Sequence, residues 1–384
     1  MPYIVISLSP FLAAPSFLST FGTLSFFSLI IANLYFYFKM STSAVLPRTI
    51  IPMICISFLF IIYLIFSVLY HDVASKTINY FFFYVFMISC IIAISFISYT
   101  KFIDIKRINK LTLYILIFLF IFAFIEYYYI FTNNGYISWV PRFERPDYAS
   151  NSFSGLYRIR LFTYESSSAG ALLNSLYLIF FITTSKSHIK KNIFVLLISF
   201  ALHLMIFSST QFVFFMIIII AQFFSSNLIS RKAKIFLLIL VLVGIVVASH
   251  EVGILINYIS NKLDGFITGN ASNASASERN KLLLIGVNAF LENPVFGGGL
   301  ASFYNYVDTG LVNFHLQTLQ QLGIFGYLLF VAFLLYPLLF FKRYTLEIKL
   351  LFILTWFTLF FSGSIWDSNL YLPYLFIAGK SNER

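Results

Sequence analysis

Long apolar stretches recur from one end of this 384-residue chain to the other, and no polar segment between them is large enough for an ordinary soluble domain. Hydrophobic residues make up 60% of the chain, whereas Asp, Glu, Lys and Arg together make up only 10%. Soluble domains carry roughly 25% charged residues, so this composition excludes that class. The sequence predicts an all-α integral membrane protein, with one polytopic domain over residues 1–384.

A membrane-spanning helix needs about 20 apolar residues, and shorter segments are tolerated where they are buried in the bundle. On that rule we expect about twelve transmembrane helices. They cover residues 3–20, 22–38, 49–70, 77–99, 111–131, 166–185, 192–208, 210–225, 235–251, 315–341, 350–363 and 368–379. The pairs 192–225 and 350–379 are each either two short helices or one long tilted helix.

Basic residues are concentrated in alternate connections between the expected spans. These connections hold 17 of the 25 lysines and arginines, namely Lys39, Arg48, Lys101, Lys106, Arg107, Lys110, Lys186, Lys190, Lys191, Arg231, Lys232, Lys234, Lys342, Arg343, Lys349, Lys380 and Arg384. Such connections face the cytoplasm, so both termini are expected inside. The net charge of +11 reflects this topology, and no nucleic-acid partner is indicated.

Two longer loops, residues 132–165 and 252–314, are then expected outside. The second contains a predicted amphipathic helix over residues 278–293, with Ser277 as its N-cap and Pro294 after its end. Leu283, Val287 and Phe290 share one face of this helix. We expect that face to lie on the bundle like a lid.

Arg158 and Arg160 close the first loop at the mouth of the next span. A guanidinium grips phosphate oxygens bidentately and keeps its charge, so the pair suits a lipid diphosphate. Alternatively, both arginines anchor the chain by snorkelling to lipid headgroups. Glu165 either pairs with an arginine or accepts a proton.

The second loop and the span after it supply further candidates. Arg279 is either another phosphate ligand or a solvated charge on the lid helix. Residues 293–299, Asn-Pro-Val-Phe-Gly-Gly-Gly, lack the lysine and the spacing of a P-loop. His315 is positioned either as a general base or as a hydrogen-bonded structural residue.

Two ionisable residues lie within the expected spans. Glu126 is a candidate functional residue, whereas His203 is expected to be structural.

Metal and nucleotide chemistry are not indicated. The two cysteines, Cys55 and Cys90, both lie inside apolar runs, so neither a disulfide framework nor a metal cage is expected. The chain also lacks an Asp-x-Asp pair for a metal-bound sugar nucleotide. We therefore expect no cofactor.

Three segments, taken in order, resemble the bacterial Wzy-type O-antigen polymerases and the broader O-antigen polymerase and ligase superfamily. Residues 158–165 resemble the family segment that opens the span after the first periplasmic loop. Residues 279–283 with 293–297, and residues 316–326, are similar to a family helix with its Asn-Pro loop and to a glycine-containing span start. The ligase branch usually carries His-Asn where this chain has Val312 and Asn313, with His315 three residues later.

The resemblance implies an enzyme that polymerises lipid-linked oligosaccharide repeat units on the periplasmic face of the bacterial inner membrane. Its partners would be polyprenyl-diphosphate-linked oligosaccharides, membrane lipid and a chain-length regulator protein. Arg158, Arg160 and Arg279 would bind the diphosphate, and His315 or Glu165 would accept the proton of the acceptor hydroxyl.

Two alternatives remain open at this point. One is a ligase of the same superfamily that transfers the finished glycan to lipid A core. The other is a flippase or another transporter of lipid-linked glycans. A transporter is expected to carry charges along a midplane pathway, whereas the charges here cluster at the outer mouth.

Overall fold

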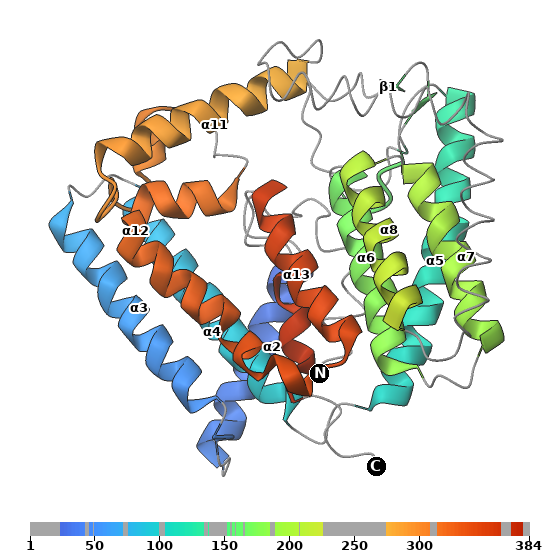
Figure 1. The fold of residues 1–384 in the computed structure, drawn as a ribbon, viewed down its shortest axis with the longest axis horizontal. Coiled ribbons are helices and arrows are strands. Elements are labelled where there is room, and N and C mark those ends of the chain that lie inside the picture. The colour runs from blue at the N-terminus through green and yellow to red at the C-terminus, as the bar shows by residue number, and fades with distance from the viewer. Residues whose placement is uncertain are drawn as a thin grey trace.

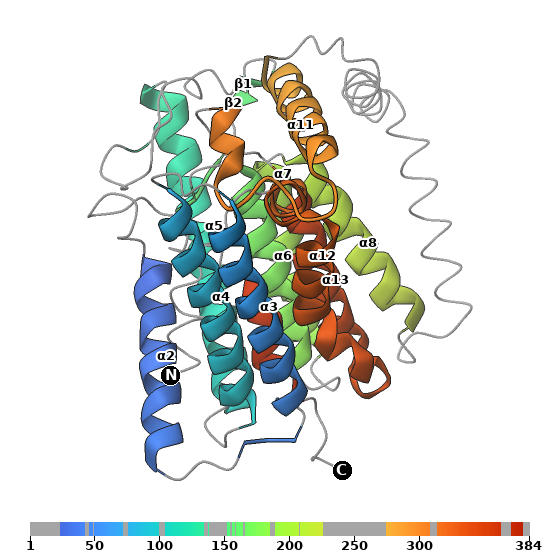
Figure 2. The same cartoon turned by 90° about the vertical axis from the view of Figure 1, so that its left-hand side faces the viewer.

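The computed structural model shows a bundle of helices that run between two ends of the molecule (Figures 1 and 2). It describes residues 24–42, 46–48, 50–71, 76–99, 104–133, 137, 152–153, 156–157, 159–163, 166–184, 189–206, 208–225, 274–307, 313–361 and 370–378. The α-helices are α2 (Leu24–Thr42), α3 (Ile51–Tyr70), α4 (Thr77–Ser98), α5 (Ile105–Asn133), α6 (Ser166–Thr183), α7 (Ile189–Ile206), α8 (Ser209–Ser225), α11 (Ala274–Glu292), α12 (Phe314–Leu335) and α13 (Leu346–Phe361). The shorter elements are β1 (Ser152–Phe153), β2 (Leu156–Tyr157) and the 3-10 helices η4 (Ser302–Asn305), η5 (Tyr336–Arg343) and η7 (Leu372–Phe376).

Four helical segments among the described residues are long and apolar enough to cross a membrane: Ile51–Tyr70, Thr77–Ser98, Ile105–Asn133 and Phe314–Leu339. Shorter apolar helices cover Ser168–Thr183 and Thr210–Phe224. Large apolar side chains such as those of Leu69 and Phe131 are exposed on the outer faces, where water would not stabilise them. The chain is a helical membrane protein, as predicted.

Most of the predicted spans in the described residues coincide with a helix. The segment 192–225 forms two helices, because α7 ends at Ile206 and α8 begins at Ser209. Two predicted spans, 3–20 and 235–251, lie outside the described residues. Residues 370–378 differ from the helix expected over 368–379, since they form 3-10 turns, including the five-residue η7, instead of an α-helix. Pro373 lies at its start and cannot donate a backbone hydrogen bond, which helps to keep this segment short.

The helices form two groups with α13 between them (Figure 1). In the first group α2 and α3 pack on α4, and α12 packs on α3. In the second group α6 packs against α5, α7 and α8, and α5 also packs against α7. Helix α13 contacts α6 of the second group and α12 of the first.

Buried polar side chains connect neighbouring helices within each group. Asn33 of α2 donates to Cys90 Sγ of α4 at 3.0 Å and accepts from the Ser89 hydroxyl at 2.5 Å. Asn174 of α6 donates to the backbone oxygen and to Oε1 of Gln211 in α8, at 3.0 and 3.1 Å. Such hydrogen bonds stabilise helix pairs in membranes, where lipid tails offer no competing partner.

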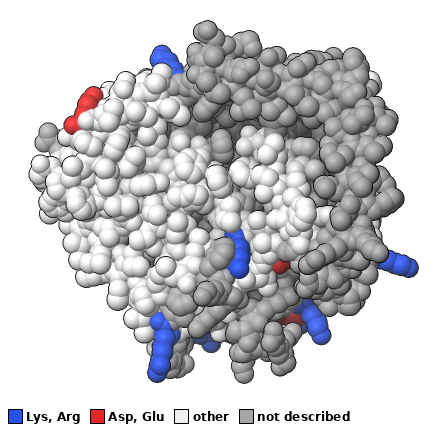
Figure 3. Space-filling view, viewed as in Figure 1, with Lys and Arg blue, Asp and Glu red and all other residues white. Residues whose placement is uncertain are grey.

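The two ends of the bundle differ in charge. The C-terminal end of α2 and the N-terminal ends of α3, α5, α7 and α13 lie at one end, and α11 lies across the other (Figures 1 and 2). In Figure 3 the described Lys and Arg side chains gather mainly in the lower half of the view, away from α11. The helix ends that the sequence marks with basic connections therefore lie together.

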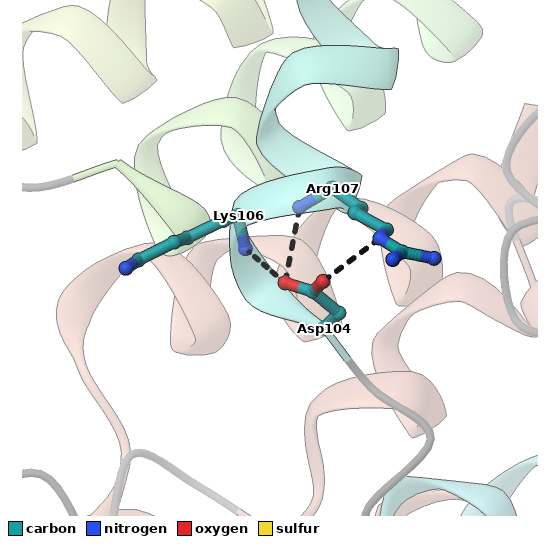
Figure 4. A network of polar contacts seen from close by, with 3 residues as sticks. All are labelled: Asp104, Lys106 and Arg107. Atoms are coloured by element: carbon teal, nitrogen blue, oxygen red, sulfur yellow. Dashed lines mark hydrogen bonds and ion pairs between the residues drawn. The ribbon is translucent and has the colours of Figure 1, made fainter.

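Asp104 caps α5 at this basic end (Figure 4). Its Oδ1 accepts the backbone N–H groups of Lys106 and Arg107 at 3.0 and 3.2 Å, and its Oδ2 lies 3.1 Å from Arg107 Nε. A capping carboxylate satisfies amides that have no partner inside the helix. This cap explains why α5 begins at Ile105 rather than near residue 111, where the apolar span was expected to begin.

Candidate functional site at the α11 end

The turn at residues 159–163 places Arg160 inside the bundle. The Arg160 carbonyl accepts the backbone N–H of Thr163 at 3.0 Å and the Thr163 hydroxyl at 2.8 Å. Leu161 adopts a positive φ of 52°, which lets the chain reverse here. Arg160 is only 6% exposed, unlike an anchor that snorkels outward to headgroups. Arg158 and Glu165, which flank this turn, lie outside the described residues.

Glu126 of α5 holds this turn in place. Its Oε2 accepts the Leu161 N–H at 2.8 Å, and the residue is fully buried. One helical turn before it, the Phe122 ring stacks on Phe162 with 4.1 Å between ring centroids. The structure thus brings the Glu126 carboxylate to the loop that carries Arg160. Its hydrogen bond with the Leu161 N–H makes Glu126 a positioning residue.

Helix α11, which carries Arg279, lies over the end of the bundle beside α12 (Figure 1). The Arg279 side chain lies outside what the structure describes. The expected N-cap is wrong, because α11 begins at Ala274 and Ser277 lies inside it. Alanine is the strongest helix former, so Ala274 and Ala276 favour a helix that begins before Ser277, although serine is a preferred N-cap residue.

The face of α11 that packs on the bundle is shifted by one position from the expected face. Leu282, Gly286 and Ala289 are buried, whereas the expected residues, Leu283, Val287 and Phe290, are half-buried beside them. Leu282 and Phe303 form a small apolar cluster against Tyr80, Tyr304, Val307 and Leu316. The helix therefore covers η4 and the start of α12.

Helix α12 is broken at Gly323, whose backbone has φ 63° and ψ −172°. The break interrupts the hydrogen bonds within the helix. Backbone groups of the loop at residues 293–299 bond to the α12 backbone groups that lose their helical partners. The carbonyls of Gln320 and Gln321 accept the N–H groups of Gly298 and Gly299 at 2.9 and 3.0 Å. Beyond the break, Ile324 N–H donates to the Pro294 carbonyl at 2.9 Å. Irregular backbone at membrane depth needs such partners, because lipid supplies none.

Close approach of the two backbones requires glycine on both sides. A Cβ on Gly297 would lie 2.4 Å from the Gln321 carbonyl oxygen, and one on Gly323 would lie 2.3 Å from the Val295 carbonyl oxygen. Both glycines also have positive φ. The N–H groups of Gly297, Gly298 and Gly299 all donate to backbone carbonyls. The triple glycine is thus a structural support for the broken span rather than an anion cradle.

His315 lies in the first turn of α12 and is 3% exposed. Its Nε2 lies 3.1 Å from the Trp356 carbonyl oxygen, which can only accept, so Nε2 carries the proton. Its Nδ1 then accepts the Tyr327 hydroxyl at 3.2 Å. The rings of Trp356 and Phe360 flank the imidazole, each with a centroid distance of 4.2 Å. The accepting nitrogen is therefore in contact with the Tyr327 hydroxyl.

Helix α12 carries a row of buried polar side chains that was not predicted from the sequence. Gln317, Thr318, Gln320 and Gln321 are each at most 3% exposed. Gln320 Nε2 donates to Ser302 Oγ at 2.9 Å, and Tyr84 of α4 donates to Gln321 Oε1 at 3.3 Å. The signal was present as Gln-Thr-Leu-Gln-Gln in an otherwise apolar span, because amides buried at membrane depth need protein partners.

The elements that carry Arg160, Arg279 and His315 lie at the same end of the bundle. Figures 1 and 2 place the short antiparallel hairpin of β1 and β2, which comes just before the Arg160 turn, at the end covered by α11. The N-terminal part of α12 lies there as well. No protein-family model matches the chain, and no curated protein matches it.

Proposed function

We propose that this protein polymerises lipid-linked repeat units of O-antigen or a related surface polysaccharide on the periplasmic face of the bacterial inner membrane. The observation that carries the proposal is the burial of Arg160 in a fixed turn at the rim of an apolar bundle. A polyprenyl diphosphate brings two phosphates to that depth, because its hydrocarbon tail lies in the bilayer. Buried arginine at the mouth of a membrane bundle suits such a ligand.

In the proposed reaction, the bond between the anomeric carbon of the growing glycan and a diphosphate oxygen breaks. A hydroxyl oxygen of the new repeat unit bonds to that carbon, and polyprenyl diphosphate leaves with the electron pair. Negative charge grows on the leaving group, and fixed guanidiniums stabilise it most in the transition state. Arg158, Arg160 and Arg279 are the proposed diphosphate ligands.

The proton of the acceptor hydroxyl goes to His315 or Glu165 in this proposal. The His315 route uses Nδ1, the nitrogen that accepts the Tyr327 hydroxyl. Tyr327 would pass its own proton to Nδ1 and take the proton of the acceptor sugar. Tyr327 is half-buried and therefore more accessible than the imidazole itself. The route needs no metal or cofactor.

The distribution of charge supports the proposed orientation. Basic connections favour the cytoplasmic side, and their helix ends lie opposite α11. The α11 end would then face the periplasm, where lipid-linked repeat units are joined.

Deletion of the gene in its native host tests the proposal directly, with the surface glycan resolved by size on a gel. A single repeat unit attached to the core is expected in the deletion strain, because one unit is still transferred but none are joined. Complementation with the wild-type chain should restore the ladder of longer glycans. A core that carries no repeat unit would contradict the proposal and indicate a ligase or a flippase.

A further inference from the structure

The first turns of α5 and α7 meet at the end opposite α11. Lys191 Nζ of α7 donates to Asn109 Oδ1 of α5. The Asn109 amide in turn donates to the Phe180 carbonyl and to Thr183 Oγ1 of α6, at 3.2 and 3.1 Å. This contact joins the two helix ends that carry five basic residues. We call them the basic seam: Lys106, Arg107, Lys110, Lys190 and Lys191.

The basic seam carries an excess of positive charge. Across residues 104–114 and 189–206, Asp104 is the only acidic residue in the sequence. Its oxygens are already engaged by the N-cap of α5 and by Arg107, whereas the Lys106 side chain extends away from it (Figure 4). Both helices also begin at the seam, so their dipoles add positive potential there.

An apolar surface adjoins the cations on both helices. On α5 the exposed apolar residues that follow the lysines along the helix are Tyr114 and Phe118. On α7 they are Ile193, Phe194 and Leu197. Lys110 Nζ lies 5.7 Å over the Tyr114 ring, at the boundary between the charged and the apolar parts. A soluble phosphate would contact only the cations. A phospholipid would contact both parts, with its acyl chains along the apolar faces.

We propose that the basic seam binds an anionic glycerophospholipid. The phosphate lies on the lysines at the ends of α5 and α7, and an acyl chain lies along the exposed faces of both helices. Lysines in this interfacial layer each add to the attraction for anionic headgroups. The site is independent of the glycan chemistry proposed for the opposite end.

The test compares two triple variants of the purified full chain. The seam variant combines Lys106→Gln, Lys110→Gln and Lys190→Gln, and it retains Arg107 and Lys191 because they hydrogen-bond within the fold. The control combines Lys39→Gln, Arg48→Gln and Lys349→Gln, which removes the same charge at the same end of the bundle. Retention of dioleoylphosphatidylglycerol against dioleoylphosphatidylcholine is measured by native mass spectrometry, and thermal midpoints are recorded in both lipids.

The wild type and the control are expected to retain the anionic lipid over the zwitterionic lipid. The seam variant should bind the anionic lipid about tenfold more weakly or worse, with an unchanged midpoint in phosphatidylcholine. Equal weakening in both triple variants would overturn the proposal and indicate diffuse charge attraction. Equal stabilisation of the wild type by soluble glycerol 3-phosphate would also overturn it, because the apolar faces would then contribute nothing.

Discussion

The turn at residues 159–163 and the loop at residues 293–299 lie at the same end of the bundle, but they satisfy their polar groups differently. Backbone groups of the loop form hydrogen bonds with backbone groups of α12, and Gly297 and Gly323 permit the two segments to approach closely. In the turn, the Glu126 carboxylate holds the backbone, and the Arg160 guanidinium is buried at the rim. The loop is therefore a scaffold, whereas the turn holds the arginine that we propose as a diphosphate ligand. Substitution of Gly297 or Gly323 should affect folding, and substitution of Arg160 should affect activity.

The largest expected effect is that of Gly323→Ala. Its backbone conformation is essentially restricted to glycine, and the new Cβ would lie 2.3 Å from the Val295 carbonyl oxygen. We expect a loss of about 3 kcal/mol or more in stability, seen as little monodisperse protein after extraction from membranes. Gly298→Ala is the matched control, because its Cβ approaches the Ser302 hydroxyl at 3.0 Å without a positive φ. Equal yields for both variants would contradict the scaffold role.

Arg160→Ala should leave the folded protein in the membrane but abolish the glycan ladder. Loss of one charged donor to a developing anion costs on the order of a hundredfold in rate. Arg160→Lys should restore activity only partly, because an ammonium keeps the charge and loses the bidentate fork. Arg48→Ala, which changes an exposed arginine at the opposite end, is the control and should keep a normal ladder. A normal ladder in Arg160→Ala would leave the turn without its proposed ligand role.

The same contrast explains what could be predicted from sequence. The helix positions could be predicted from the lengths of the apolar stretches, because the bilayer sets those lengths. Glu126 could be selected as a candidate residue, because an ionisable side chain inside a span is costly and rare. The break at Gly323 lies inside a run that was expected to form one continuous helix. Its hydrogen-bond partners come from residues 294–299, so only the folded arrangement reveals it. The buried face of α11 likewise depends on Phe303, which it contacts in space.

His315→Gln separates a proton-accepting role from a structural one. Glutamine can donate to the Trp356 carbonyl and accept from Tyr327, but it cannot take up a proton at neutral pH. If the proton route runs through Tyr327, His315→Gln and Tyr327→Phe should each lose about a hundredfold in polymerisation rate, measured with isolated membranes. Near-normal rates in both variants, together with an inactive Glu165→Gln, would assign the proton to Glu165.

Glu126→Gln should have the smallest effect, and it tests whether holding the turn and binding the ligand are separate tasks. Glutamine keeps an oxygen that can accept the Leu161 N–H but removes the negative charge. Hydrogen bonds to charged groups exceed neutral ones by roughly 1 kcal/mol, so we expect a loss of about that size in stability and a ladder close to normal. Glu126→Ala removes the acceptor from a fully buried site and should cost about 2–3 kcal/mol. If Glu126→Gln were as inactive as Arg160→Ala at an unchanged thermal midpoint, the carboxylate itself would take part in the chemistry. The turn would then be a charged pair acting on substrate rather than an arginine held by a support.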